Sequence, residues 1–118
     1  MQTEPRLTLE TTIQTDAIQG DAAIVRCTGK LTAGVTDILS SEIKRLIPDY
    51  KWVVLDLTNL TQMDSMGLGT VVRLYVSARS AGTSLQLINL SKRVRELLGI
   101  TNLLHVFEVF GEERMRFP

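Results

Sequence analysis

The stretch from Trp52 to Gly69, WVVLDLTNLTQMDSMGLG, constrains the fold more than any other part of this chain. It opens with an apolar run that is typical of a strand buried on both faces of a parallel sheet. A polar turn is predicted at Thr58-Asn59, and a helical pattern begins a few residues later. Asp64 and Ser65 are residue types that cap the start of a helix. The stretch therefore predicts a serine hydroxyl at a helix N-terminus, at the carboxyl edge of a sheet, where open α/β sheets place their ligand chemistry.

Composition excludes several classes of function. The chain has 118 residues, and we expect residues 1–118 to form one domain whose core spans about residues 7–110. Lysine plus arginine and aspartate plus glutamate both number 13, so no basic field attracts nucleic acid or a membrane surface. Cys27 and His105 are each the only residue of their type, which is too few for an internal disulfide or a zinc site.

The sequence also carries no sign of membrane insertion or export. No apolar run approaches the ~20 residues that a membrane span requires, and the N-terminus MQTEPRLTLE has no signal-peptide pattern. We expect a cytoplasmic protein without metal or cofactor, either a monomer or a weak homodimer.

The first half of the chain predicts a hairpin followed by a helix. Apolar and polar residues alternate over residues 7–13 and 22–28, with a Gly-Asp turn signal between them, as in two antiparallel strands. Thr32 is the predicted N-cap of the next helix. Its apolar positions recur at helical spacing until Pro48 stops it.

The second half alternates helices and strands. We expect a helix over residues 66–81 that Gly82 ends in a left-handed conformation, and then a strand over residues 84–90. A short helix follows from a Ser91 cap to Gly99, and a last strand over residues 105–110. The inner stripe of the longer helix is expected to be Leu68, Val71, Val72, Tyr75 and Val76. The order ββαβαβαβ predicts an α/β domain: a mixed, mostly parallel sheet with an N-terminal antiparallel hairpin, and helices packed on it.

Ser65 admits three interpretations. As a helix cap it contributes on the order of 1 kcal/mol to stability. As a hydrolase nucleophile it lacks half of the nucleophile-elbow motif, because Met63 stands where a glycine is needed and only Gly67 matches. The one candidate base, His105, has nothing to orient it, so we expect no catalytic residues and no enzyme. As a phosphoacceptor, Ser65 gains a charge of about −1.5 to −2 that helix amides tolerate and a docked partner does not.

Three other residues of the same stretch, Gly67, Gly69 and Asp56, are expected to have structural roles. Gly67 and Gly69 do not form a dinucleotide-binding loop, because the GxGxxG pattern is absent. They are expected to allow close backbone approach, either to a neighbouring strand or to a docked partner. Asp56 is expected to make a turn-forming hydrogen bond rather than to bind a ligand.

The chain resembles a known family. Gly29-Lys30-Leu31-Thr32 before a helix, then VVLDLTNLTQMDSMGLG, a helix ending in Gly82, and SLQLINLSKRVRELLGITNLL together resemble a STAS domain. The resemblance is strongest to the bacterial anti-sigma factor antagonists and spans roughly residues 7–109. Its most specific part, residues 63–69, is similar to the family's D-S-x-G-L-G phosphorylation motif.

This resemblance implies a regulator of transcription without catalysis of its own. The unphosphorylated protein would bind an anti-sigma factor that is also an ATP-using serine kinase, which releases the sigma factor. Phosphorylation of Ser65 would weaken that complex, and a metal-dependent serine phosphatase would reset the switch. The residues implied to bind the partner are Asp64, Met66, Gly67, Leu68, Gly69, Lys30 and Thr32.

The chain departs from the family pattern in three places. Thr32 stands where relatives often carry an acidic residue, which is expected to affect partner choice. Met66 replaces a residue that is often serine or threonine, leaving one acceptor in the motif. The tail beyond Gly111 is short for the extra C-terminal helix of many relatives. We also expect an exposed apolar docking patch around Met63, Met66 and Leu68.

A second hypothesis comes from a different class of protein. STAS modules also serve as constitutive scaffolds or ligand-binding units in signalling assemblies and beside membrane transporters. A nucleotide-hydrolysing role ranks below both, because the chain has no P-loop lysine–serine pattern.

Overall fold

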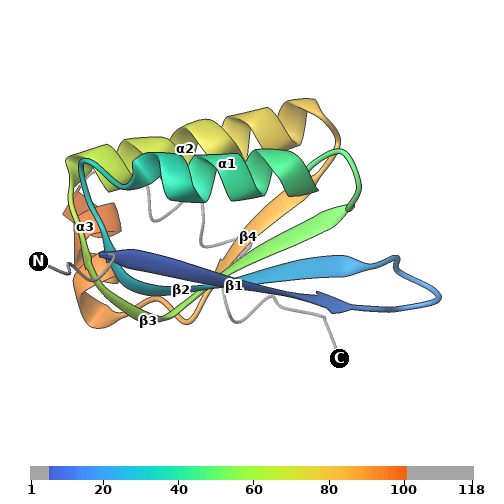
Figure 1. Ribbon diagram of the computed structural model, residues 1–118, viewed down its shortest axis with the longest axis horizontal. Coiled ribbons are helices and arrows are strands. Elements are labelled where there is room, and N and C mark those ends of the chain that lie inside the picture. The colour runs from blue at the N-terminus through green and yellow to red at the C-terminus, as the bar shows by residue number, and fades with distance from the viewer. Residues whose placement is uncertain (1–5, 101–118) are drawn as a thin grey trace, which may run out of the picture.

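A computed structural model describes residues 6–100 of the chain, with side chains described as far as Leu97 (Figure 1). The elements, in order, are β1 Leu7–Gln14, β2 Ala22–Leu31, α1 Thr36–Leu46, β3 Trp52–Met63, α2 Ser65–Ser80, β4 Ser84–Ile88 and α3 Lys92–Ile100. The strand expected over residues 105–110 lies outside the described residues. The predicted order of elements is confirmed up to α3.

The described strands form one mixed sheet in the order β1-β2-β3-β4. β1 and β2 make the predicted antiparallel hairpin, which pairs Leu7 with Gly29 at one end and Gln14 with Ala22 at the other. β3 is parallel to both β2 and β4, as the crossovers through α1 and α2 require. The α/β class with a mostly parallel sheet is therefore confirmed.

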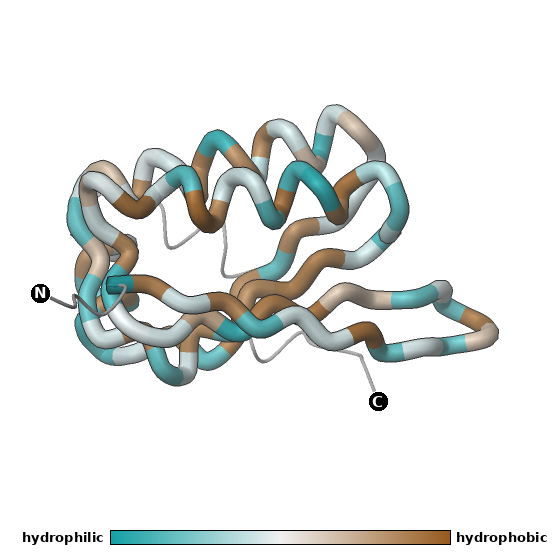
Figure 2. Tube along the Cα trace, in the orientation of Figure 1, coloured by the Kyte–Doolittle hydropathy of each residue, from teal (hydrophilic) through white to brown (hydrophobic). Residues whose placement is uncertain are grey.

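The core lies between one face of the sheet and helices α1 and α2, which run side by side above it (Figure 1). Hydrophobic segments recur along the strands and along both helices (Figure 2). Burial of each large aliphatic side chain favours folding by roughly 1.5–3 kcal/mol. Those contributing from the sheet are Val25, Val53, Leu55, Leu57, Leu85 and Leu87, and those from the helices are Leu39, Ile43, Leu46, Leu68, Val71 and Leu74.

β3 is longer than the sequence predicts. Thr58 and Asn59 were expected in a turn, but both lie within the strand, which continues to Met63. Pairing with β2 persists to Leu31 opposite Met63, with two register shifts on the way. Such irregularities bend a strand without ending it, so exposed polar residues here do not mark a turn. As a result, β2 and β3 end together beside the start of α2 (Figure 1).

α1 begins later than predicted. Its N-cap is Val35, which makes no side-chain capping bond, and the helix starts at Thr36. The prediction that Thr32 caps this helix is wrong: Thr32 is 7% exposed and its carbonyl accepts the Val35 amide at 3.2 Å in a turn that precedes the helix. The predicted stop is confirmed, since the helix ends at Leu46, shortly before Pro48.

α2 begins at Ser65 with Asp64 as its N-cap, and Gly82 beyond its end has the predicted positive φ of 80°. Its buried face is rotated relative to the expected stripe. Val76, expected inside, is 56% exposed, whereas Thr70, expected outside, is 1% exposed. Thr70 can face the core because its hydroxyl donates to the Met66 carbonyl at 3.0 Å.

The last described elements differ from prediction only at their ends. β4 stops at Ile88 rather than Leu90, because Asn89 takes a positive φ of 59° that breaks the strand. Ser91 caps α3 as predicted, with its hydroxyl accepting the Val94 amide at 3.2 Å. The predicted end at Gly99 is wrong, since the helix includes Ile100.

Candidate functional site

Asp64 connects three segments at the junction of β3 and α2. One carboxylate oxygen, Oδ1, accepts the Gly67 amide at 2.9 Å and so satisfies a free N–H of the first helical turn. The other, Oδ2, accepts the Ala33 amide at 2.9 Å from the loop between β2 and α1. Hydrogen bonds from the Ala33 and Gly67 amides stabilise the ionised carboxylate and lower the pKa of Asp64. A single carboxylate thus fixes the helix start against a loop distant in sequence.

Gly67 packs against the chain's own backbone. A Cβ at this position would collide with the Leu31 carbonyl oxygen at the end of β2. The Asp64 amide donates to that same carbonyl at 3.3 Å. Of the two roles that the sequence left open for this glycine, close approach to a neighbouring strand is the one that the structure displays. Gly69 is different, because a Cβ there would meet only the Arg73 guanidinium, at an ordinary 3.5 Å.

Ser65 and Met66 are the exposed residues of the helix start. Ser65 is the first residue of α2 and is exposed, and Met66 is 55% exposed. The other two members of the expected apolar patch face inward: Met63 is 9% exposed and Leu68 is 6% exposed. The patch prediction is therefore wrong for these two residues, which pack into the core, and right only for Met66.

The remaining sequence-predicted site residues lie at the end of β2. Lys30 is exposed on the strand, and Thr32 follows it at the start of the loop. Thr32 is buried beneath Arg6, whose Nη1 donates to the Thr32 hydroxyl oxygen at 3.4 Å. Sequence reasoning missed Arg6, because nothing in the local pattern before β1 indicates a contact with a loop so far along the chain.

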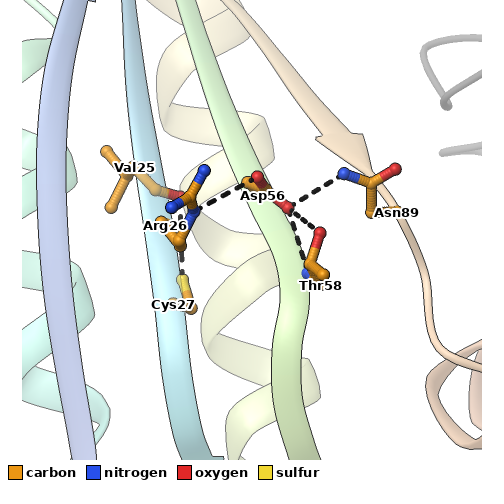
Figure 3. Close-up of polar contacts among 6 residues, drawn as sticks. All are labelled: Val25, Arg26, Cys27, Asp56, Thr58 and Asn89. Carbon is orange, nitrogen blue, oxygen red and sulfur yellow. Dashed lines mark hydrogen bonds and ion pairs between the residues drawn. The ribbon is translucent and has the colours of Figure 1, made fainter.

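Asp56 forms a second carboxylate site on the opposite face of the sheet from α1 and α2 (Figure 3). Its Oδ1 accepts the Thr58 amide at 3.0 Å, the Thr58 hydroxyl at 2.6 Å and the Asn89 side-chain amide at 3.1 Å. Arg26 Nε lies 3.6 Å from its Oδ2. Burial opposes ionisation, but these donors outweigh it and lower the pKa of Asp56. Asp56 therefore makes the predicted hydrogen bond to a nearby amide, although within a strand rather than in a turn.

The described residues do not supply other obvious chemistry. Burial, together with the charge of Asp56, raises the pKa of the Cys27 thiol to about 12, so this thiol is not a nucleophile at neutral pH. Residues 6–100 contain no cluster of three or more His, Cys, Asp or Glu side chains able to hold a metal ion. None of the helices described is long and apolar enough to cross a membrane. His105 lies outside the described residues.

The described part of the chain has two open pockets whose lining does not include Ser65. One, of about 340 Å³, is lined by residues near the C-terminal end of α2, including Tyr75, Arg79 and Ser84. The other, of about 350 Å³, lies between β3 and α3 and is lined by Met63, Arg93 and neighbouring residues of α3. Both are open at the surface, whereas sites for small ligands are usually enclosed.

Comparison with known proteins gives a consistent result. The family model described as the STAS domain matches residues 12–114. The anti-sigma F factor antagonist of Paenibacillus polymyxa is 27% identical over 92 residues, which cover 76% of this chain and 79% of that protein.

Two solved structures show the same fold at low identity. The Bacillus cell fate determinant SpoIIAA in its phosphorylated form has a TM-score of 0.62 at 18% identity, covering 85% of this chain and 88% of that one. A sulfate transporter family protein from Wolinella succinogenes has a TM-score of 0.69 at 20% identity, covering 80% of this chain and 78% of that one. At these identities the likeness extends to the fold alone.

Proposed function

We propose that this chain, which belongs to the STAS domain family, is an anti-sigma factor antagonist controlled by phosphorylation of Ser65. Unphosphorylated, it binds an anti-sigma factor that is also a serine kinase, and a sigma factor is released. Phosphorylation of Ser65 ends this binding, and a metal-dependent serine phosphatase restores it. The similarity to an antagonist over most of both chains supports the role, and a phosphorylated structural neighbour indicates that this fold can carry a phosphate.

The observation that carries the proposal is the position of the Ser65 hydroxyl. Ser65 is exposed at the first residue of α2, where a kinase can reach it. The capping bond at this helix start is made by Asp64, so the fold does not depend on the serine oxygen for its cap. The positive end of the helix dipole tolerates an added phosphate, and the domain is expected to stay folded.

The same geometry accounts for the loss of binding. A phosphate on Ser65 places a dianion directly beside the Asp64 carboxylate and the exposed Met66 side chain. A partner that covers this surface would have to desolvate two adjacent anions, which costs several kcal/mol when no cation pairs with them. Met66 would otherwise give that partner an adaptable apolar contact.

The site residues divide into two kinds in this proposal. Ser65, Asp64, Met66 and Lys30 present their groups to the partner, and the partly exposed Gly69 lies on the same helix turn. Thr32, Gly67 and Leu68 are buried and act through the shape of the loop and of the helix start. The chain is a substrate and a binder without catalysis of its own. It needs no cofactor, acts in the cytoplasm as one domain spanning residues 1–118, and binds neither nucleic acid nor membrane.

The proposal predicts a serine kinase among the genes beside this one, and the test is whether that kinase phosphorylates this chain. Incubation with that kinase and ATP is expected to add one phosphate per chain, located on Ser65 by mass spectrometry of proteolytic peptides. Ser65→Ala should remain unmodified. Ser77→Ala is the matched control, because it removes an exposed serine from the same helix, and it should be modified like the wild type.

Absence of phosphate on Ser65, with Ser65→Ala binding the kinase no differently from the wild type before and after ATP is added, would reject the switch. The protein would then fit the second hypothesis, a constitutive STAS scaffold or ligand-binding unit in a signalling or transport system.

A further inference from the structure

Arg6 binds the loop between β2 and α1 at two points. This loop, residues 32–35, follows the end of β2 and lies beside the start of α2 (Figure 1). Arg6 Nη2 donates to the Ala33 carbonyl at 2.7 Å, and Nη1 donates to the Thr32 hydroxyl oxygen at 3.4 Å. The Arg6 carbonyl also accepts the Lys30 amide at 2.7 Å. Both the backbone and the side chain of this residue therefore contact the end of β2 and the loop.

Two glycines shape the chain around Arg6. A Cβ at Gly29 would collide with the Arg6 carbonyl oxygen, and a Cβ at Gly34 would collide with its Nη2. Gly34 also has a φ of +95°, which side-chain-bearing residues rarely adopt. Because Gly29 fits closely against the Arg6 carbonyl and Gly34 against the Arg6 guanidinium, the side chain of Arg6 has one defined position on the loop.

The backbone of Ala33 is held at both its amide and its carbonyl. Arg6 binds its carbonyl, and Asp64 Oδ2 accepts its amide at 2.9 Å. The other oxygen of Asp64 accepts the Gly67 amide in the first turn of α2. A continuous series of hydrogen bonds thus runs from Arg6 through Ala33 to Asp64 and the helix that carries Ser65. Ala33 and Gly34 are exposed, so this part of the loop is accessible to a partner beside the helix that carries Ser65.

We propose that Arg6 is a positioning residue that holds the 32–35 loop in register with Ser65, so that the kinase recognises both as one surface. This inference rests on the proposed function. The loop's geometry is set before the partner arrives, which lowers the ordering cost of binding. Arg6 does not touch the Ser65 hydroxyl in this account and takes no part in phosphoryl transfer.

Only an arginine can make this arrangement. Its two terminal nitrogens lie in a fixed plane and reach two different acceptors, whereas a lysine has one nitrogen at the end of a flexible stem. Arg6→Lys keeps the charge but cannot hold Thr32 and Ala33 together. It should therefore behave like Arg6→Met. If simple charge attraction held the loop, Arg6→Lys would instead behave like the wild type.

The first test needs no partner protein. In amide NMR spectra recorded from pH 7 to pH 2, Ala33 and Gly67 should both report ionisation of Asp64 in the wild type. In Arg6→Met and Arg6→Lys the pH response of Ala33 should shrink while that of Gly67 persists, because only the loop is released. An undiminished Ala33 response in both variants would overturn the inference.

The second test measures phosphorylation kinetics with the neighbouring-gene kinase. Loss of one or two hydrogen bonds of about 1 kcal/mol each corresponds to a roughly 5- to 30-fold change in an equilibrium. We expect Arg6→Met to raise KM by about that factor with kcat unchanged. Arg45→Met is the matched control, since Arg45 is an exposed arginine whose Nε and Nη2 bind Glu42 within α1.

The two tests separate the possible failures. A released loop with an unchanged KM would overturn the recognition role of Arg6. A fall in kcat with constant KM would also overturn it, because a group that only positions a docking surface should affect binding. If wild-type Ser65 is not phosphorylated at all, the proposed function fails and the recognition role fails with it, while the NMR result still decides whether Arg6 holds the loop.

Discussion

Asp56 and Asp64 belong to the same part of the chain, yet their surroundings differ. Asp56 lies inside β3, is 6% exposed, and is bonded mainly by side chains of the sheet and the loop after β4. Asp64 lies just past the end of β3, is partly exposed, and is bonded by the Ala33 and Gly67 amides. Both have a lowered pKa. Asp56 stabilises the sheet. Asp64 holds the start of α2 against the loop after β2, and because Asp64 makes the capping bond, the Ser65 hydroxyl is not needed for it.

The largest loss of stability should come from Asp56. Asp56→Ala removes the shared acceptor of Thr58 and Asn89 and leaves these donors without their partner, at a cost of about 3 kcal/mol. Urea denaturation should show this loss, while phosphorylation of Ser65 in the folded fraction stays as in the wild type. Asp56→Asn, which keeps an oxygen acceptor, should lose less. An Asp56→Ala variant as stable as the wild type would contradict the claim that Asp56 stabilises the sheet.

Gly67→Ala should destabilise the contact between the start of α2 and the end of β2. The added methyl group meets the backbone of Leu31, which cannot rotate away, and overpacking of this kind costs about 1–3 kcal/mol. Gly69→Ala provides a control of opposite sign, because its methyl group finds ordinary contact and alanine favours a helix by roughly 0.5–1 kcal/mol over glycine. Thermal denaturation of the pair measures both effects. Equal shifts in the two variants would contradict the close approach at Gly67.

Acid should weaken both carboxylate sites. An unfolded aspartate has a pKa of about 3.9, and the folded values of Asp56 and Asp64 lie below it. Their contribution to stability is therefore complete above the unfolded pKa and is lost as the pH falls through the folded values. The unfolding free energy should be level from about pH 7 to pH 5 and then decline below about pH 4. Asp56→Asn and Asp64→Asn should each reduce that decline, and a variant whose decline matches the wild type would contradict the lowered pKa of the residue it replaces.

Met66→Ser should have the smallest effect on folding. With 55% of the side chain exposed, the expected change in unfolding free energy is within about 0.5 kcal/mol. Its affinity for the kinase, measured by titration calorimetry, should fall because an apolar contact is lost. Val76→Ser, at a residue equally exposed farther along α2, should leave the affinity unchanged. Loss of affinity in both variants would place the docking surface elsewhere on the helix.

The sequence predicts those parts of this fold that depend on local pattern. Alternation of apolar residues gave the hairpin, the capping preference of aspartate located the start of α2, and Gly82 marked its end. The errors arise where distant residues decide. Thr58 and Asn59 remain in β3 because β2 continues to pair beside them, a contact that no local window contains.

The candidate site shows the same division. Ser65 and Asp64 follow from a short motif, and their exposure and capping agree with it. The contact of Arg6 could not be predicted from the sequence, because its acceptor, the Ala33 carbonyl, lies far along the chain and comes close only in the fold. The inward orientation of Met63 and Leu68 likewise depends on how α2 packs on the sheet, so an apolar motif residue can belong to the core rather than to a docking patch.

The most direct test of the central claim compares the same protein with and without phosphate on Ser65. Affinity for the neighbouring-gene kinase and the free energy of unfolding should be measured on both purified forms. We expect the phosphate to weaken binding at least about 10-fold, equivalent to 1.4 kcal/mol, while the unfolding free energy changes by less than about 1 kcal/mol. Equal affinity of the two forms, or a phosphorylated form that has lost its fold, would contradict the account.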